Sequence, residues 1–171
     1  MAGVKLDAID LHILRDLQDN GRMTNVELAH RAGISPPPCL RRVRTLERSG
    51  CIRGYHADID PQALGFTVTV YAQVGLHSQA EADLQAFEKR VTAWPEVREC
   101  HMLAGETDFL LKIVATDWDA YQRFLTTKLT PAPNVSVVKS ALAIRTAKRA
   151  PGVPIGVAAG EAPSGARASG R

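Results

Sequence analysis

The sequence lacks an apolar run of the roughly 20 residues that a membrane-spanning helix requires. Residues 1–10 also lack the apolar core of a secretory signal. The chain has only three cysteines, an odd number, and their spacing is not that of a zinc site. These absences predict a cytoplasmic protein with reduced thiols and with no metal or other cofactor.

A nucleophile–base pair is also missing from the sequence. The five histidines are dispersed along the chain, at positions 12, 30, 56, 77 and 101. His101 follows Cys100 in a predicted strand, so the two side chains point to opposite faces of the sheet and cannot form a catalytic pair. Because the chain has no glycine-rich phosphate loop either, we predict that it is not an enzyme.

Positive charge is concentrated in one part of the chain, although the formal net charge of the whole is only +3. Residues 31–53 contain six arginines against a single acid, Glu47, and therefore carry +5. A solvated surface helix would be the simplest explanation of such a run. A local concentration of arginine is also typical of a surface that contacts nucleic acid.

Residues 7–50 are predicted to form three helices. Asp7 is a capping residue for the first helix, which ends at Asn20-Gly21. Thr24, followed three residues later by Glu27, has the capping-box pattern and opens the second helix. Gly33 closes the second helix, and Ser35 is expected to cap a third. Three helices with a tight glycine turn between the second and third are typical of a helix-turn-helix.

The third predicted helix begins with three prolines, which its first turn tolerates because those N–H groups have no partner within the helix. Its buried side is predicted to carry Leu40, Val43 and Leu46. The arginines fall on another side, with a spacing of three and four residues. Arginine can hydrogen-bond a guanine edge through two donors or bind a phosphate. The tight turn and the capping signals favour DNA binding over a merely solvated face.

The predicted DNA contacts divide into two groups, because residues near the start of a recognition helix reach bases and later ones meet the backbone. Those expected at base edges are Pro37, Pro38 and Arg41. Those expected at phosphates are Arg42, Arg44 and Arg48, with Thr24, Asn25 and Ser35 as further candidates. Arg53 and Tyr55, just beyond this helix, are candidates for a wing against phosphate.

The hydrophobic pattern changes after Gly50. Residues 51–60 are expected to be an extended linker, and the segments that follow alternate between strand and helix. The expected elements are a strand at 66–76, a helix at 80–93, a hairpin of 97–103 and 109–115, a helix at 117–129 and a strand at 135–144. This order is the ferredoxin-like βαββαβ arrangement, with both helices on one face of the sheet. A partner subunit is the simplest cover for the other face.

The predicted fold class is therefore α+β, with an N-terminal three-helix, winged-helix-like domain followed by a ferredoxin-like domain. We expect a helix-turn-helix domain with its linker strand over 1–60, a sensing and oligomerisation domain over 61–149, and a disordered tail over 150–171. The tail is rich in Gly, Ala, Ser and Pro and has too few large apolar residues to form a core.

Several motifs together resemble one family of regulators. They are Leu6-Asp7-Ala8-Ile9-Asp10, Asn20-Gly21-Arg22, Gly33-Ile34-Ser35-Pro36, Pro38-Cys39-Leu40, Gly50-Cys51-Ile52 and Gly105-Glu106-Thr107-Asp108-Phe109. The chain resembles the leucine-responsive and asparagine-regulator (Lrp/AsnC) family of bacterial transcription regulators over residues 5–148. Two positions depart from the family pattern: Pro37 stands where threonine is frequent, and Glu106 stands where aspartate is frequent.

The resemblance implies a homodimer that forms through the sheet, assembles to an octamer and binds an amino acid between dimers. The implied effector residues are Met102, Leu103, Ala104, Gly105, Asp108 and Trp118. Asp108 would bind the effector's ammonium group, and Gly105 would allow close approach of the backbone. From their chemistry alone, Gly105 and Asp108 favour a hairpin turn over a ligand site, and the ligand role rests on the resemblance.

We therefore expect a nucleoid-associated transcription regulator that binds double-stranded DNA and responds to an amino acid. The alternative is a ligand-independent architectural protein that wraps DNA around its oligomer. The helix-turn-helix is compatible with both functions.

Overall fold

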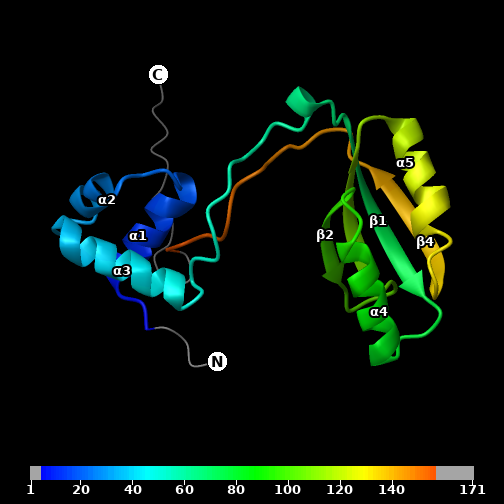
Figure 1. Cartoon of the computed structure of the whole chain (residues 1–171), viewed down its shortest axis with the longest axis horizontal. Coiled ribbons are helices and arrows are strands. Elements are labelled where there is room, and N and C mark those ends of the chain that lie inside the picture. The colour runs from blue at the N-terminus through cyan, green and yellow to red at the C-terminus, as the bar shows by residue number, and fades with distance from the viewer. Residues whose placement is uncertain (1–4, 157–171) are drawn as a thin grey trace, which may run out of the picture. The chain divides into compact units, whose positions relative to one another are not determined.

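The computed structural model describes residues 5–156, and these divide into two compact units. Residues 5–58 with 148–156 form the N-terminal unit, and Ile59–Ala147 form the second unit (Figure 1). None of the helices in the described residues is long and apolar enough to cross a membrane. Each unit has its own cluster of buried apolar side chains.

The N-terminal unit contains the three predicted helices: α1 (Ala8–Asp19), α2 (Asn25–Arg31) and α3 (Pro36–Arg48). The capping box that Thr24 was predicted to open is present at α2, and Asp7 makes a second one at α1. Gly33 follows α2 with a φ of 68°, a left-handed conformation that favours glycine. The helices pack around a small core made of Ile13, Leu28, Ala29, Cys39 and Leu46.

The expected linker, residues 51–60, does not form a strand in the described structure. Residues 51–60 carry no strand assignment, and a short 3₁₀ turn, η1 (Gln62–Leu64), follows them. A strand is defined by the ladder it makes with a neighbour, and no described segment pairs with these residues. The expected linker strand is therefore absent from the described residues.

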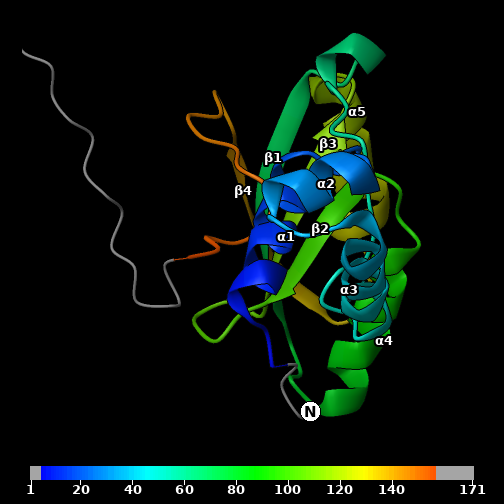
Figure 2. The same ribbon diagram turned by 90° about the vertical axis from the view of Figure 1, so that its left-hand side faces the viewer.

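The second unit contains the strands β1 (Val68–Leu76), β2 (Val97–Met102), β3 (Phe109–Ala115) and β4 (Val135–Leu142). They form one antiparallel sheet in the order β2-β3-β1-β4. With α4 (Glu81–Thr92) and α5 (Trp118–Phe124), this is the predicted ferredoxin-like order βαββαβ. Figure 2 shows α4 and α5 together on one side of the sheet.

The side of the sheet that faces the helices forms the core of this unit. β3 alternates strictly, with Phe109, Leu111, Ile113 and Ala115 buried and the residues between them partly exposed. The opposite side has no cover in the described chain, and its exposed side chains include Tyr71 and Val137. Alternation of this kind is expected for a sheet that packs on helices through one face only.

The second helix of this unit differs from the prediction. The sequence predicted one helix over 117–129, but α5 ends at Phe124 and a π-helical turn, η2 (Leu125–Leu129), continues it. The hydroxyls of Thr126 and Thr127 donate to the carbonyl oxygens of Gln122 and Arg123. Such side-chain bonds compete with the regular helical ladder.

The C-terminal segment also differs from the prediction. The disordered tail was expected to begin at residue 150, but residues 148–156 pack on the N-terminal unit. The Gln18 side chain bonds the backbone of Val153 twice, donating to its carbonyl at 2.9 Å and accepting from its N–H at 2.9 Å. Arg149 pairs with Asp58 at 2.5 Å. Residues 157–171, the rest of the expected tail, lie outside the described residues.

Candidate nucleic-acid interface and effector loop

One side of α3 presents an uninterrupted exposed ridge. Pro37, Arg41, Arg44 and Arg48 are all exposed, and their spacing of four, three and four residues keeps them in line along the helix. Cys39 and Leu46 lie on the opposite side and are buried. The structure thus gives four of the predicted DNA-contacting residues a common outward face.

The arginines of the basic segment fall into two groups. Arg31 binds Asp16 through two hydrogen bonds, Nε to Oδ2 at 2.7 Å and Nη2 to Oδ1 at 2.8 Å. Arg41, Arg44 and Arg48 form no ion pair with a carboxylate of the described residues. Three of the four arginines of this segment without a carboxylate partner therefore lie on the exposed ridge of α3, and the fourth is Arg53, beyond the helix.

Arg42 belongs to the paired group, which differs from its predicted phosphate contact. Its Nη1 donates to Oδ2 of Asp7, the N-cap of α1, at 2.8 Å and to Oδ1 of Asp10, in the first turn of α1, at 2.7 Å. These bonds raise the pKa of the guanidinium, and the bond to Asp10 has the larger effect. Arg42 therefore ties α3 to α1, and its charge is already balanced by two carboxylates.

The buried side of α3 is rotated relative to the prediction. Leu40 was expected in the core, but it is 39% exposed and is absent from the core cluster, whereas Cys39 is fully buried. Adjacent residues on a helix differ by about 100° in direction, so this shift of one residue turns Leu40 toward the ridge. Both residues are apolar, and the sequence could not distinguish them.

Ser35 occupies the N-cap position of α3, yet its hydroxyl makes no capping bond. An N-cap side chain accepts from the N–H of the second or third helical residue, and here these are Pro37 and Pro38, which have none. The Ser35 hydroxyl therefore stays available for another partner. Pro38 is only partly exposed.

The start of α2 is already engaged with neighbouring groups. The Thr24 hydroxyl donates to Glu27 Oε2 at 2.8 Å, within the capping box. Asn25 Nδ2 donates to the carbonyl oxygen of Pro36 at 2.9 Å and so joins the start of α2 to the start of α3. Asn25 Oδ1 is buried with no hydrogen-bond partner in the described chain. The two residues position the recognition helix, and a phosphate contact by either one stays a prediction.

The residues after α3 include an aromatic side chain that packs back on the helix. Tyr55 donates a hydrogen bond to Glu47 Oε1 at 3.0 Å. Burial and this bond raise the pKa of the Tyr55 phenol to about 12. Arg53 is exposed. Without a strand in this stretch, neither residue belongs to a wing of paired strands in the described chain.

The predicted effector residues lie in the loop between β2 and β3 or directly before it, except for Trp118. Backbone bonds close the loop, from Leu103 N–H to Asp108 oxygen at 2.8 Å and from Asp108 N–H to Val74 oxygen at 3.0 Å. The Asp108 carboxylate accepts from Leu76 N–H at 2.7 Å through Oδ2. Asp108 thus fastens the loop to the end of β1 and uses one carboxylate oxygen to do so.

Gly105 has no structural reason to be glycine. Its φ is not positive, and a Cβ built there would meet nothing within 4 Å. Met102 and Ala104 beside it are exposed, Met102 to 61%. The loop therefore offers open space at its tip, which its own turn geometry does not require.

Trp118 lies at the other end of the sheet. The loop precedes β3 and Trp118 follows it, and seven residues of strand at about 3.3 Å each separate the two by about 20 Å. Trp118 packs on Tyr121 with ring centroids 5.3 Å apart. Within one protomer Trp118 therefore does not adjoin Gly105, and its part in an effector site between dimers stays a prediction.

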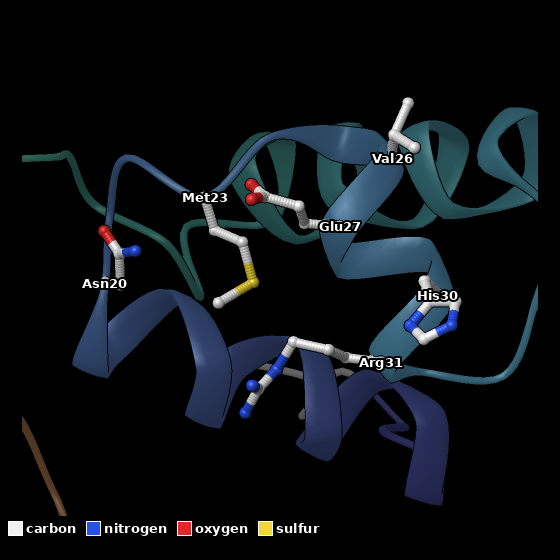
Figure 3. A pocket seen from close by; sticks show the side chains of 6 residues that line it. All are labelled: Asn20, Met23, Val26, Glu27, His30 and Arg31. Carbon is white, nitrogen blue, oxygen red and sulfur yellow. The ribbon is translucent and has the colours of Figure 1, made fainter.

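A depression of about 390 Å³ lies in the N-terminal unit, between the end of α1 and α2 (Figure 3). It is lined by Asn20, Met23, Val26, Glu27, His30 and Arg31, none of which was predicted to bind an effector. Glu27 bonds Thr24 and Arg31 bonds Asp16, so two of its charged groups are already paired. No cluster of residues that could hold a metal occurs in the described chain.

Comparison with known proteins agrees with this two-unit organisation. Residues 6–53 match the winged helix-turn-helix DNA-binding family, and residues 69–153 match the Lrp/AsnC ligand binding domain. The chain is 53% identical over 147 residues to a leucine-responsive regulatory protein of Rhizobium meliloti, covering 86% of this chain and 94% of that one. It is 42% identical to a Bkd operon transcriptional regulator of Pseudomonas aeruginosa, covering 83% and 93%.

A solved structure is similar over nearly the whole chain. A transcriptional regulator of Neisseria meningitidis, in complex with L-methionine, superposes with a TM-score of 0.85 at 36% identity and covers 90% of this chain and 99% of that one. The matched families and relatives are regulators, so the chain is not an enzyme. With its helix-turn-helix and its ligand binding domain, the chain belongs to the Lrp/AsnC family of transcription regulators.

Proposed function

We propose that this regulator binds the DNA major groove through α3 and that an amino acid bound at the β2–β3 loop controls this binding. The observation that carries the DNA part is the sorting of the arginines. Arg41, Arg44 and Arg48 are exposed on one ridge and have no carboxylate partner in the described chain, whereas Arg31 and Arg42 are paired. An unpaired row of guanidinium groups fits the phosphates and guanine edges of a duplex.

The roles of the exposed residues follow from their order along the helix. Arg41 and Pro37 lie near its start and would contact base edges, and Arg44 and Arg48 would bind phosphates. The unengaged Ser35 hydroxyl is a further phosphate donor. Because its proposed partner is DNA, we propose that the protein acts in the cytoplasm, at the nucleoid.

The open tip of the β2–β3 loop supports the effector part of the proposal. The relative from Neisseria meningitidis is a complex with L-methionine, and a loop with free space at Gly105 would let an amino-acid carboxylate approach the backbone N–H groups. The second Asp108 oxygen would accept from the ammonium group. Leu103 and Met102 would contact the side chain.

The uncovered face of the sheet supports a homodimer, with assembly to an octamer as the larger proposed state. This face combines Tyr71 and Val137 with the side chains of Lys112 and Lys139. A second copy would cover the apolar part, with Lys139 on the edge strand β4 and Lys112 already paired with Glu99 at 2.7 Å. Sedimentation of the full chain and of Tyr71→Glu would test this, and a smaller particle is expected for the variant.

The DNA part is tested with duplexes that the full chain enriches from a random-sequence pool. We expect Arg41→Ala to weaken binding by about 1–3 kcal/mol, roughly 5- to 150-fold. Arg44→Ala should weaken binding to all sequences and reduce its salt dependence. Arg90→Ala, an exposed arginine on α4, is the matched control. Equal affinities of all three variants and the parent would refute the assignment.

The effector part is tested by calorimetric titration with L-methionine and the other amino acids. Gly105→Ala is the informative variant. The fold has room for the added methyl group, but that group would occupy the space of a ligand bound closely against the backbone. We expect the variant to keep the parent's melting temperature and to lose effector binding. If no amino acid binds the parent at millimolar concentration, a ligand-independent architectural role replaces the regulatory one.

A further inference from the structure

The start of α3 lacks the donor groups that a helix N-terminus normally offers. Its first three residues are Pro36, Pro37 and Pro38, so none of them has an N–H. The first N–H is that of Cys39, and it already bonds the carbonyl oxygen of Ser35 at 3.3 Å. The end of the helix that would reach furthest into the groove therefore cannot bind through backbone amides.

This end of the helix presents hydrocarbon instead. Pro37 is exposed, and Leu40, three residues later on the same side, is 39% exposed and outside the core cluster. We call these two residues the apolar pair. Arg41 and Arg44 flank the pair, at the spacing that makes helical residues neighbours.

Base edges in the major groove carry one hydrocarbon group, the C5-methyl of thymine. We propose that the apolar pair contacts a thymine methyl in each half-site, beside a guanine bound by Arg41, and so determines the sequence preference of this regulator. The inference rests on the proposed DNA binding and adds the identity of a base that α3 recognises.

The charge around the apolar pair decides between DNA and a protein as its partner. Exposed apolar residues often mark a protein interface, but Arg41 and Arg44 flank this pair, Arg48 follows on the same ridge, and none of the three has a carboxylate partner in the described chain. Burying three unpaired guanidinium groups against an apolar protein surface would be costly. A duplex supplies phosphates for the arginines and methyl groups for the pair at once.

The test removes single methyl groups from DNA. Each thymine of a duplex enriched by the full chain is replaced in turn by deoxyuridine, which loses only the methyl group and keeps its base pairing. Affinity is measured by fluorescence anisotropy at fixed salt. At one or two positions in each half-site we expect a loss of about 4-fold, the value of one buried methyl group.

Variants of Leu40 connect that loss to the apolar pair. In Leu40→Ala, deoxyuridine at the sensitive position should cause little further loss, because the contact is already gone. Leu40→Gln, one atom longer on an exposed site, replaces the hydrocarbon end by an amide, which should shift the preference toward adenine. Circular dichroism confirms that each variant is folded before its affinity is compared.

The outcomes separate this inference from the proposed function. Tight, salt-dependent binding that no deoxyuridine weakens would overturn the methyl contact and leave DNA binding intact. A loss of the same size in the parent and in both Leu40 variants would assign the methyl to another residue and also overturn the inference. If the pool yields no bound duplex, the proposed DNA binding falls and the inference falls with it.

Discussion

Removing Arg31 should destabilise the N-terminal unit, although the residue belongs to the same basic segment as the proposed DNA contacts. Its partner Asp16 is 3% exposed, and both carboxylate oxygens accept from Arg31. His12 Nε2 lies 3.5 Å from Asp16 Oδ2, a single longer contact that does not replace the two shorter hydrogen bonds from the guanidinium. Arg31→Ala would therefore leave a buried carboxylate without its main partner.

The magnitude lies between two known cases. An exposed ion pair contributes at most about 1 kcal/mol, while breaking a buried pair costs about 3–5 kcal/mol. Because Arg31 is 56% exposed and Asp16 is buried, we expect a loss of about 2 kcal/mol in the free energy of unfolding. In a unit of this size, that corresponds to a melting temperature lower by about 8–16 °C.

The chain allows the two units to be followed separately. Its two tryptophans, Trp94 and Trp118, both lie in the second unit, so tryptophan fluorescence reports that unit alone. Far-UV circular dichroism also reports the helices of the N-terminal unit. Arg31→Ala should lower the unfolding midpoint of the helical signal and leave the fluorescence transition unchanged.

Arg44→Ala is the matched control, since this arginine is exposed and has no carboxylate partner in the described chain. It should change the free energy of unfolding by less than about 0.5 kcal/mol and should weaken DNA binding. The reasoning is refuted if Arg31→Ala unfolds together with the parent, or if Arg44→Ala is the less stable of the two.

Acid provides a second readout of the same pair. The hydrogen bonds from Arg31 lower the pKa of Asp16 below its ordinary value of 3.8. A native pKa that is lower than the unfolded one stabilises the fold above the unfolded value, and this contribution is lost as the pH falls through the native pKa. The parent should therefore lose stability below about pH 4 more steeply than Arg31→Ala.

Three further predictions concern other parts of the chain. In Gly152→Ala the added Cβ would lie 1.9 Å from Gln18 Oε1 at a φ of 62°, so proteolysis after residue 147 should become faster, and equal rates would contradict the docking of this segment. In an alkaline absorbance titration, Tyr55→Phe should remove the phenol that ionises near pH 12. The stability that the raised pKa of Tyr55 contributes is present below the unfolded pKa and is lost as the pH rises through the native pKa of about 12. Although Cys100 is exposed, desolvation by its surroundings, with a smaller effect of Glu88, raises its pKa to about 11, so its alkylation near neutral pH should be slower in the native chain than in urea.

The sequence determined the elements of this protein because their signals are local. The capping boxes at Asp7 and Thr24 join residues three apart, and the glycine after α2 adopts the φ that its position predicted. Strand alternation and the order of the elements were sufficient for the ferredoxin-like fold, since a strand with one buried face repeats every two residues. The ridge of exposed arginines on α3 followed from helical spacing in the same way.

Only the tertiary structure decided which polar groups are free. Arg42 meets Asp7 and Asp10 across 35 and 32 residues, so the spacing within α3 gave no sign that its charge is balanced. The position of Trp118, at the far end of β3 from the effector loop, depends on the strand that separates them. A contact between distant segments is fixed by how the elements pack, and a single sequence records the elements more directly than their packing.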